Sequence, residues 1–252
     1  MTAVQGDSVD IRTPDGVADA YLAHPDDGAA HPGVILFVDA FGLRPATREM
    51  ADRLAAGGYT VLVPNVFYRH GRAPVVDLPD FIDHGDRTGT FAKIGPIMQS
   101  LTAELAMRDA GAYLQWLADD PRATDGPVGL TGYCMGARLA LLTAGTYPDR
   151  VAAAAGFHGG RLATDDPHSP HLVADNVTAE LYFGHADGDQ SMPPEQIERL
   201  DKALDQAGVR YRAEVYPGAS HGYTMPDTSV YQEEGAERHY TELLALFGRT
   251  LG

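Results

Sequence analysis

The chain has 252 residues, of which 44% are hydrophobic, and a formal net charge of −16. This length fits one large α/β domain spanning residues 1–252, and the hydrophobic share is that of an ordinary globular protein with a sizeable core. The strongly acidic balance disfavours nucleic acid and anionic membranes as partners, so we expect a small-molecule partner.

The number of cysteines and the N-terminal residues indicate the cellular compartment in which the protein is expected. A single cysteine excludes an intrachain disulfide, so nothing in the sequence requires an oxidising compartment. No basic stretch followed by an apolar run opens the chain, and the longest apolar runs are too short to span a bilayer. We therefore expect a cytoplasmic protein, and we leave monomer or homo-oligomer open.

The first quarter of the chain predicts the edge of a sheet followed by a strand–helix–strand unit. Residues 9–12 and 18–24 alternate around a turn and predict an antiparallel hairpin. Apolar runs and amphipathic spacing then predict three more elements: a buried strand at 33–38, a helix at 45–56 and a strand at 59–63.

The next segment is harder to interpret. Residues 67–90 show no periodicity, and a long irregular segment in a compact domain is either functional, as a lid or pocket wall, or a surface loop. Apolar side chains at helical spacing then predict one long helix at 97–117. Asp109 falls at the edge of that apolar stripe, so we expect it to face water.

The second half repeats the alternation of strand and helix. Strands are predicted at 127–131, 151–157, 179–183 and 211–216, and helices at 137–147, 194–207 and 229–251. The last helix is expected to be capped near Thr228 or Ser229. Such alternation predicts an α/β fold with a mainly parallel central sheet, helices on both faces and the N-terminal antiparallel hairpin at its edge.

The only cysteine lies in the motif Gly-Tyr-Cys-Met-Gly at residues 132–136, between a predicted strand and a predicted helix. A Gly-x-nucleophile-x-Gly motif in this setting is typical of the nucleophile elbow. The elbow places its central side chain at a helix N-terminus, which favours an anion such as a thiolate. The alternative is that Cys134 is a small buried hydrophobic residue.

Candidate partners for Cys134 follow two later strands. Asp187 and Asp189 come after the strand at 179–183, and His221 comes after the strand at 211–216. The order nucleophile, acid, histidine is that of elbow hydrolases, and the carboxyl ends of parallel strands bring such loops together. We therefore predict a Cys-His-Asp hydrolase that works through an acyl-enzyme.

Other histidines are candidates for a metal site or for a catalytic base. His158, His168 and His171 invite a metal site, but no cysteine accompanies them, so we expect no metal. His185 precedes the acidic pair and is interpreted as a polar loop residue. The N–H of Met135 and an N–H of the 39–42 loop, from Ala40, are the predicted oxyanion hole.

The sequence resembles the dienelactone hydrolase (carboxymethylenebutenolidase-like) family of the α/β-hydrolase fold along nearly its whole length. The matching segments are residues 39–42, 57–59, 64–67, 132–136, 184–187 and 220–222. The resemblance implies hydrolysis of cyclic enol-lactone esters without a cofactor or metal. It assigns Cys134 as nucleophile, His221 as base and Asp187, rather than Asp189, as the acid that orients the histidine.

The resemblance also bears on Asp39. In the family a glutamate at a similar place holds the resting thiol, which implies that Asp39 contacts Cys134 and keeps its proton in place. The alternative is that Asp39 caps the helix at 45–56. Phe41 and Tyr133 flank the oxyanion loop and the elbow, and they wall the substrate pocket or pack in the core.

The substrate prediction rests on a departure from the family. Relatives that act on dienelactones hold the substrate carboxylate with arginines, one of them shortly after the catalytic histidine. Here Tyr223 and Met225 follow His221 with no arginine, and Arg69, Arg72 and Arg87 lie in a segment whose pattern does not match. We therefore predict a pocket, bordered by Tyr223, that prefers neutral esters or lactones.

Two other functions stay open at this stage. A thiol nucleophile also suits thioesters or peptides, and the chain could be a silent binding or regulatory protein on the same fold. Turnover of a chromogenic ester that a thiol alkylator abolishes would favour the esterase or lactonase.

Overall fold

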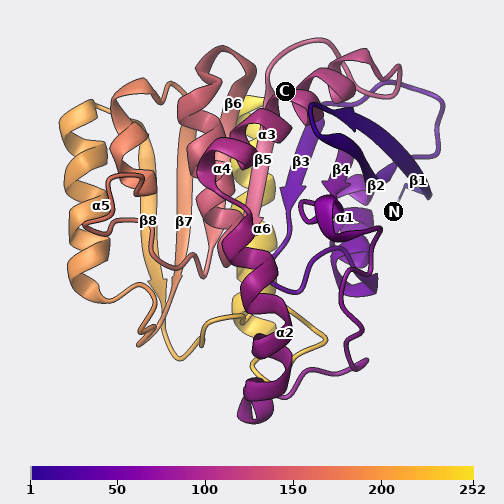
Figure 1. The fold of residues 1–252 in the computed structure, drawn as a ribbon. Coiled ribbons are helices and arrows are strands. Elements are labelled where there is room, and N and C mark those ends of the chain that lie inside the picture. Colours follow the sequence, from indigo (N-terminus) through magenta and orange to yellow (C-terminus); the bar gives the residue numbers. More distant parts are fainter. Residues whose placement is uncertain (1) are drawn as a thin grey trace.

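A single mixed sheet organises the computed structural model, which describes residues 2–252 except for the side chains of residues 86–88. Within these residues the strand order is β1-β2-β4-β3-β5-β6-β7-β8 (Figure 1). The strands are β1 (Val4–Thr13), β2 (Gly16–Pro25), β3 (Gly33–Phe37), β4 (Thr60–Pro64), β5 (Val128–Tyr133), β6 (Val151–Phe157), β7 (Glu180–Ala186) and β8 (Tyr211–Tyr216). Among the described strands, the β1–β2 and β2–β4 pairs are antiparallel and the other neighbouring pairs are parallel, which confirms the predicted fold class.

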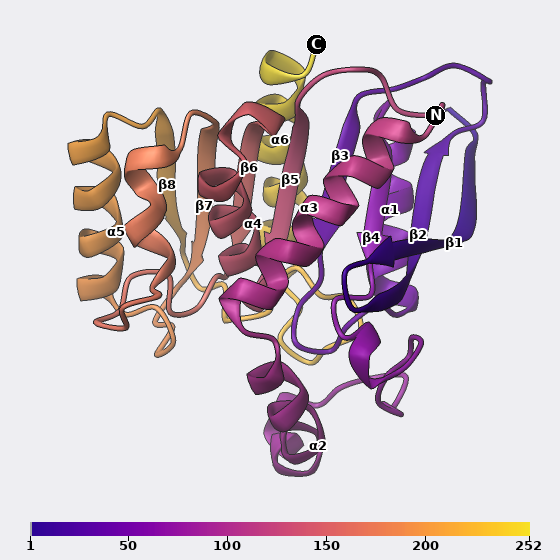
Figure 2. The ribbon, with the colours of Figure 1, turned by 45° about the horizontal axis from the view of Figure 1, so that its top comes forward.

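Helices cover both faces of the sheet. They are α1 (Pro45–Ala56), α2 (Arg87–Ser100), α3 (Ala103–Asp119), α4 (Met135–Thr146), α5 (Pro194–Ala207) and α6 (Glu233–Thr250). In both ribbon views α3, α4 and α5 lie on one face and α1 and α6 on the other (Figures 1 and 2). Helix α2 lies beyond the carboxyl ends of the parallel strands. No described helix is both long and apolar enough to cross a membrane.

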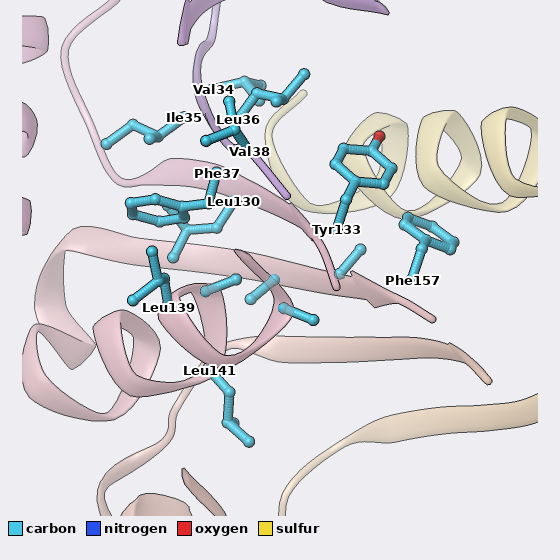
Figure 3. Close-up of a cluster of buried hydrophobic side chains, with 14 of the residues drawn as sticks. Val34, Ile35, Leu36, Phe37, Val38, Leu130, Tyr133, Leu139, Leu141 and Phe157 are labelled. Carbon is cyan, nitrogen blue, oxygen red and sulfur yellow. The ribbon is translucent and has the colours of Figure 1, made fainter. Parts of the chain in front are cut away.

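The core sits where the central strands meet the helices. Every residue of β3, β4 and β5 is buried, as expected for parallel strands covered on both faces. Figure 3 shows β3 and β5 side chains clustered with Leu139 of α4, while Tyr133 and Phe157 point toward α6. This packing holds the strand ends, and hence the loops after them, in fixed positions.

The predicted helix at 97–117 is wrong, because the chain forms two helices there. Helix α2 ends at Ser100, and Thr102 caps α3 by accepting the Leu105 N–H at 3.2 Å. Thr102 is therefore a local start signal inside a continuous apolar stripe.

Asp109, predicted to face water, is 1% exposed. It is held by Arg69 at 2.7 and 2.9 Å and by the Tyr68 hydroxyl at 3.0 Å. A buried, ion-paired carboxylate at the edge of the apolar stripe was not distinguishable by spacing from a solvated one.

The start of α6 was also misplaced. Gln232, not Thr228 or Ser229, is its N-cap. The Ser229 N–H donates to the Ile82 carbonyl at 3.0 Å, and the Ser229 hydroxyl accepts the His84 N–H at 2.8 Å. The residues expected to cap α6 instead fasten the segment before α2 to the loop after β8.

Candidate active site

Cys134 stands at a strained turn between β5 and α4. Its φ is +54°, a region that L-residues rarely adopt. A Cβ on Gly132 would lie 2.1 Å from the Gly136 carbonyl oxygen, and a Cβ on Gly136 would lie 2.2 Å from the Phe37 carbonyl oxygen. Both clashes are with backbone, so both glycines are required for α4 to start this close to β3. The elbow predicted from the sequence is present.

His221 follows β8 and is held by a carboxylate that follows β7. Its Nδ1 lies 2.6 Å from Asp189 Oδ2. The Ser191 hydroxyl and N–H both donate to Asp189 Oδ1, at 2.7 and 2.8 Å, so the carboxylate is fixed from two sides. Burial alone raises the pKa of Asp189, but the contacts with His221 and Ser191 outweigh it and leave the pKa below its usual value.

The other side of His221 interacts with Cys134. Burial lowers the pKa of His221, but the Cys134 sulfur and the Asp189 carboxylate together raise it to about 10. A carboxylate and a sulfur beside one buried imidazole favour the imidazolium. Cys134, His221 and Asp189 therefore form one continuous chain of interacting groups.

The prediction that Asp187 orients the histidine is wrong. Asp187 is exposed, and its carboxylate accepts the Gly218 N–H at 2.8 Å, which links the loops after β7 and β8. Gly188, with φ at +63°, reverses the chain after Asp187, and the next residue is the one that reaches His221. The Asp-Gly pair was a turn signal in the sequence that pointed to this arrangement.

A cavity of about 650 Å³ opens over the chain of interacting groups, and both Cys134 and His221 line it. Phe41 lines it as predicted, in edge-to-face contact with Phe91 of α2. His84 and Met98 also line it. Residues 67–90 were interpreted either as a lid or pocket wall or as a surface loop. Because His84 lines the cavity, the end of this segment around His84 is part of the pocket wall.

The predicted oxyanion residues face the same cavity. Ala40 and Met135 both line it. Among the described residues, no group accepts a hydrogen bond from either backbone N–H. Two donors without acceptors beside a nucleophile are what an oxyanion hole requires.

The carboxylate of Asp39 binds Arg44 instead of the Cys134 thiol. Arg44 binds its carboxylate through two nitrogens, at 2.6 and 3.0 Å. Arg44 also binds Asp227, at 2.6 and 3.1 Å, and the two carboxylates raise the pKa of its guanidinium despite burial. Asp39 lines the cavity, but the implied contact with Cys134 is replaced by a buried ion triad that fixes the oxyanion loop to the loop after β8.

Tyr133 and Tyr223 are core residues. Of the two interpretations of Tyr133, core packing is the one observed, and the prediction that Tyr223 borders the substrate pocket is wrong. Both are 0% exposed, and neither lines the cavity. The Tyr133 hydroxyl lies 3.2 Å from His239 Nε2 of α6, and the Tyr223 hydroxyl donates to the Gly184 carbonyl at 3.1 Å. Figure 3 shows the Tyr133 ring directed toward α6, opposite to the side of α4.

The sequence did not predict several residues of the cavity wall. Among them are His158, Arg138 and Arg161. His158 packs edge-on against His221, with ring centroids 5.3 Å apart, and its Nε2 lies 2.7 Å from the Thr224 hydroxyl. Arg138 lies four residues after Cys134 on α4, so helical spacing could have placed it above the nucleophile.

The histidines considered for a metal are dispersed. His158 is buried beside His221, His168 is exposed, and His171 Nδ1 lies 3.0 Å from the Ser169 hydroxyl. Within the described part of the chain, no group of three or more His, Cys, Asp or Glu side chains is arranged to hold a metal ion.

The arginines considered as an anion clamp are engaged elsewhere. Arg69 pairs with Asp15 and Asp109, and Arg72 pairs with Asp10 at the far edge of the sheet. The Arg87 side chain lies outside the described residues.

Comparisons with known proteins identify the family of the chain. The model of the dienelactone hydrolase family matches residues 18–251. A carboxymethylenebutenolidase from Rhodococcus opacus is 29% identical over 229 residues, covering 90% of this chain and 84% of the relative. A relative from Methylorubrum extorquens, provisionally given the same name, is 27% identical over 239 residues, covering 93% and 78%.

Solved structures show the same fold. A Klebsiella pneumoniae protein, provisionally named a dienelactone hydrolase, superposes with a TM-score of 0.85 at 23% identity, covering 98% of this chain and 99% of that one. The dienelactone hydrolase of Anabaena variabilis superposes with a TM-score of 0.67 at 22% identity, covering 99% of each chain. Since the family model spans nearly the whole chain, this protein belongs to the dienelactone hydrolase family, on the α/β-hydrolase fold.

Proposed function

We propose that this protein hydrolyses carboxylic esters or lactones through an acyl-enzyme on Cys134. The observation that carries the proposal is that His221, whose Nδ1 lies 2.6 Å from Asp189, lines one cavity together with Cys134. The relative from Rhodococcus opacus, named carboxymethylenebutenolidase, supports a lactone as one substrate class.

Acylation uses the charged pair of sulfur and imidazole. The Cys134 thiolate attacks the ester carbonyl, and the carbonyl electrons move onto oxygen between the N–H groups of Met135 and Ala40. As the tetrahedral intermediate collapses, the carbon–oxygen bond breaks and the His221 imidazolium gives its proton to the departing alkoxide. In a lactone that alkoxide remains attached to the acyl group. A thioester on Cys134 and a neutral imidazole result.

In deacylation His221 acts as a base, whereas in acylation it acts as an acid. Neutral His221 takes a proton from a water molecule as the water attacks the thioester. The second intermediate collapses with the sulfur as leaving group, which releases the acid and restores the thiolate beside the imidazolium. Asp189 keeps Nδ1 of the ring protonated throughout, so that the other nitrogen faces the reacting atoms.

The rate at which Cys134 is alkylated tests whether Cys134 and His221 form a pair of thiolate and imidazolium. The pKa of His221 is raised to about 10, so the imidazolium is present at pH 7 and is lost as the pH rises through about 10. We expect iodoacetamide to label Cys134 at pH 7 about 10-fold faster in the wild type than in His221→Asn, because an ordinary thiol is only a few per cent ionised there. Labelling should abolish turnover of 4-nitrophenyl acetate in parallel.

The difference between the two proteins should shrink toward pH 10, where any thiol ionises. His171→Asn is the matched control, since His171 is a partly buried histidine outside the cavity, and it should label like the wild type. Equal labelling of wild type and His221→Asn at pH 7, or full ester turnover after complete alkylation, would contradict the proposal.

A further inference from the structure

The guanidinium of Arg44 joins the loop that contains Ala40 to the loop that contains His221. Arg44 is buried and is the N-cap residue of α1. It donates two hydrogen bonds to the carboxylate of Asp39, which directly precedes Ala40 in the sequence. It donates two more to the carboxylate of Asp227, in the loop after β8 that begins with His221 and its neighbours. One buried side chain therefore bridges two separate parts of the candidate site.

The contacts of Arg44 and Asp39 enclose Ala40 from both sides. Arg44 Nη1 also donates to the Gly42 carbonyl at 3.2 Å, and Arg44 Cζ lies 5.3 Å from the centre of the Phe41 ring. The Asp39 carboxylate accepts the Phe41 N–H at 3.0 Å, and the Asp39 carbonyl accepts the Gly42 N–H at 3.1 Å. The direction of the Ala40 N–H therefore depends on a turn that the guanidinium holds.

The loop after β8 is fastened to the same guanidinium at more than one point. Arg44 Nη2 lies 3.5 Å from Met225 Sδ, in addition to its contact with Asp227. The Met225 N–H donates to the Gly222 carbonyl at 2.9 Å, so this part of the loop folds back onto the residue after His221. A shift between Arg44 and Asp227 would therefore change the position of His221 relative to the oxyanion loop.

Charge and shape both favour an arginine at this point. Asp39 lines the cavity, and an unpaired carboxylate there would repel the negative charge that develops on the carbonyl oxygen. The guanidinium offsets that charge, and its planar set of donors binds two carboxylates at once. A lysine ammonium supplies the charge but lacks the planar set of donors.

We propose that Arg44 is a positioning residue of the reaction: it holds the Ala40 N–H where the oxyanion forms, at a fixed distance from His221. The proposal rests on the hydrolase function proposed above. Among the described residues that line the cavity over the thiol, Arg44 is not found, so it acts through the two loops that it joins. A misplacement of about 1 Å in a reacting site can cost about 100-fold in rate, so such a role should be visible in kcat.

Two variants weaken the bridge while leaving Asp39 paired with a cation. Arg44→Lys keeps the charge but loses the planar set of donors. Asp227→Ala leaves one guanidinium with one carboxylate, so no unpaired charge is buried and the fold should persist. Arg53→Lys is the matched control, because Arg53 lies on the same helix and pairs with Glu237 at the exposed surface. Thermal unfolding checks the fold of each protein.

We expect Arg44→Lys and Asp227→Ala to lower kcat for 4-nitrophenyl acetate about 10- to 100-fold. Because acylation and deacylation both form an oxyanion, KM should change less than about threefold. Asp227→Asn, which keeps an oxygen acceptor for Arg44, should retain more activity than Asp227→Ala. Arg53→Lys should behave as the wild type.

Two thiol reagents separate the position of the oxyanion hole from general damage to the site. The Cys134 thiolate adds to the carbonyl carbon of 1,1,1-trifluoroheptan-2-one, and the carbonyl electrons move onto an oxygen that occupies the oxyanion hole. With iodoacetamide the sulfur displaces iodide, and no oxyanion forms. The Kd of the ketone is measured as protection of Cys134 from iodoacetamide, which requires no turnover.

This Kd should rise about 10-fold in Arg44→Lys and Asp227→Ala, because the ketone adduct resembles the tetrahedral intermediate. The rate of labelling without ketone should stay within about twofold of the wild type, because the thiol and His221 are unchanged. Unchanged ketone affinity in both variants would overturn the positioning role, whatever their kcat. Equal losses of ketone affinity and labelling rate would also overturn it, because the damage would then lie at the thiol or in the fold. A wild type that binds the ketone but turns over no ester would contradict the hydrolase function alone.

Discussion

Cys134→Ala should reduce hydrolysis of 4-nitrophenyl acetate by roughly 10⁴-fold or more, because the attacking atom is removed and triad members act as a unit. The thermal unfolding midpoint should change little. Alanine is small enough for the elbow, and its strain at positive φ is similar to that of the cysteine it replaces. The measurement is kcat/KM on purified protein, with circular dichroism to check the fold.

Cys134→Ser is the matched variant, because it keeps a nucleophilic atom at the same place. We expect weak but measurable turnover, since the hydroxyl is not ionised at neutral pH and His221 must act as a base on it. A Cys134→Ala protein that keeps more than a tenth of wild-type activity would show that another group carries the reaction.

Asp189→Asn should lower kcat for the same neutral ester by roughly 10³-fold, whereas Asp187→Asn should cost less than about 10-fold. The amide at residue 189 no longer fixes the tautomer of His221 and removes the negative charge that favours its imidazolium. An amide oxygen at residue 187 still accepts the Gly218 N–H, so the loop it holds should persist.

The comparison of the two aspartates is internally controlled, because the same substitution is made two residues apart in one loop. The pH dependence adds a second readout: the basic limb of the kcat/KM profile should move to lower pH in Asp189→Asn, since one of the two groups that raise the pKa of His221 is lost. A larger loss of kcat at residue 187 would restore the assignment made from family spacing.

The sequence predicted the fold well because its signals are local. Helix α1 and strands β6 and β8 occupy the residues expected, since Pro45 and Gly57 delimit the helix and the strands are short apolar or alternating runs. The break between α2 and α3 was missed because continuous apolar spacing outweighed a single capping threonine.

The nucleophile and histidine of the candidate site were also predictable, because the elbow motif and the strand ends are local features. The acid was not, because the turn at Gly188 decides which aspartate faces His221. The role of Asp39 was predicted wrongly because its carboxylate binds Arg44. Arg44 is held in turn by Asp227, which is distant in the sequence, so no local pattern indicated this ion triad. Arg161 was missed because its position depends on a hydrogen bond to Ser191 in another loop.

The most direct test of covalent catalysis by Cys134 is rapid acid quench of the reaction with 4-nitrophenyl acetate, followed by mass analysis of the peptide that contains residue 134. It should be made on the wild type and on Asp189→Asn, in which deacylation is slowed. The account predicts an acetyl group on Cys134 that forms as nitrophenol is released and disappears as acetate is produced. Nitrophenol release with no acetyl on this peptide in either protein, or with acetyl on another residue, would contradict it.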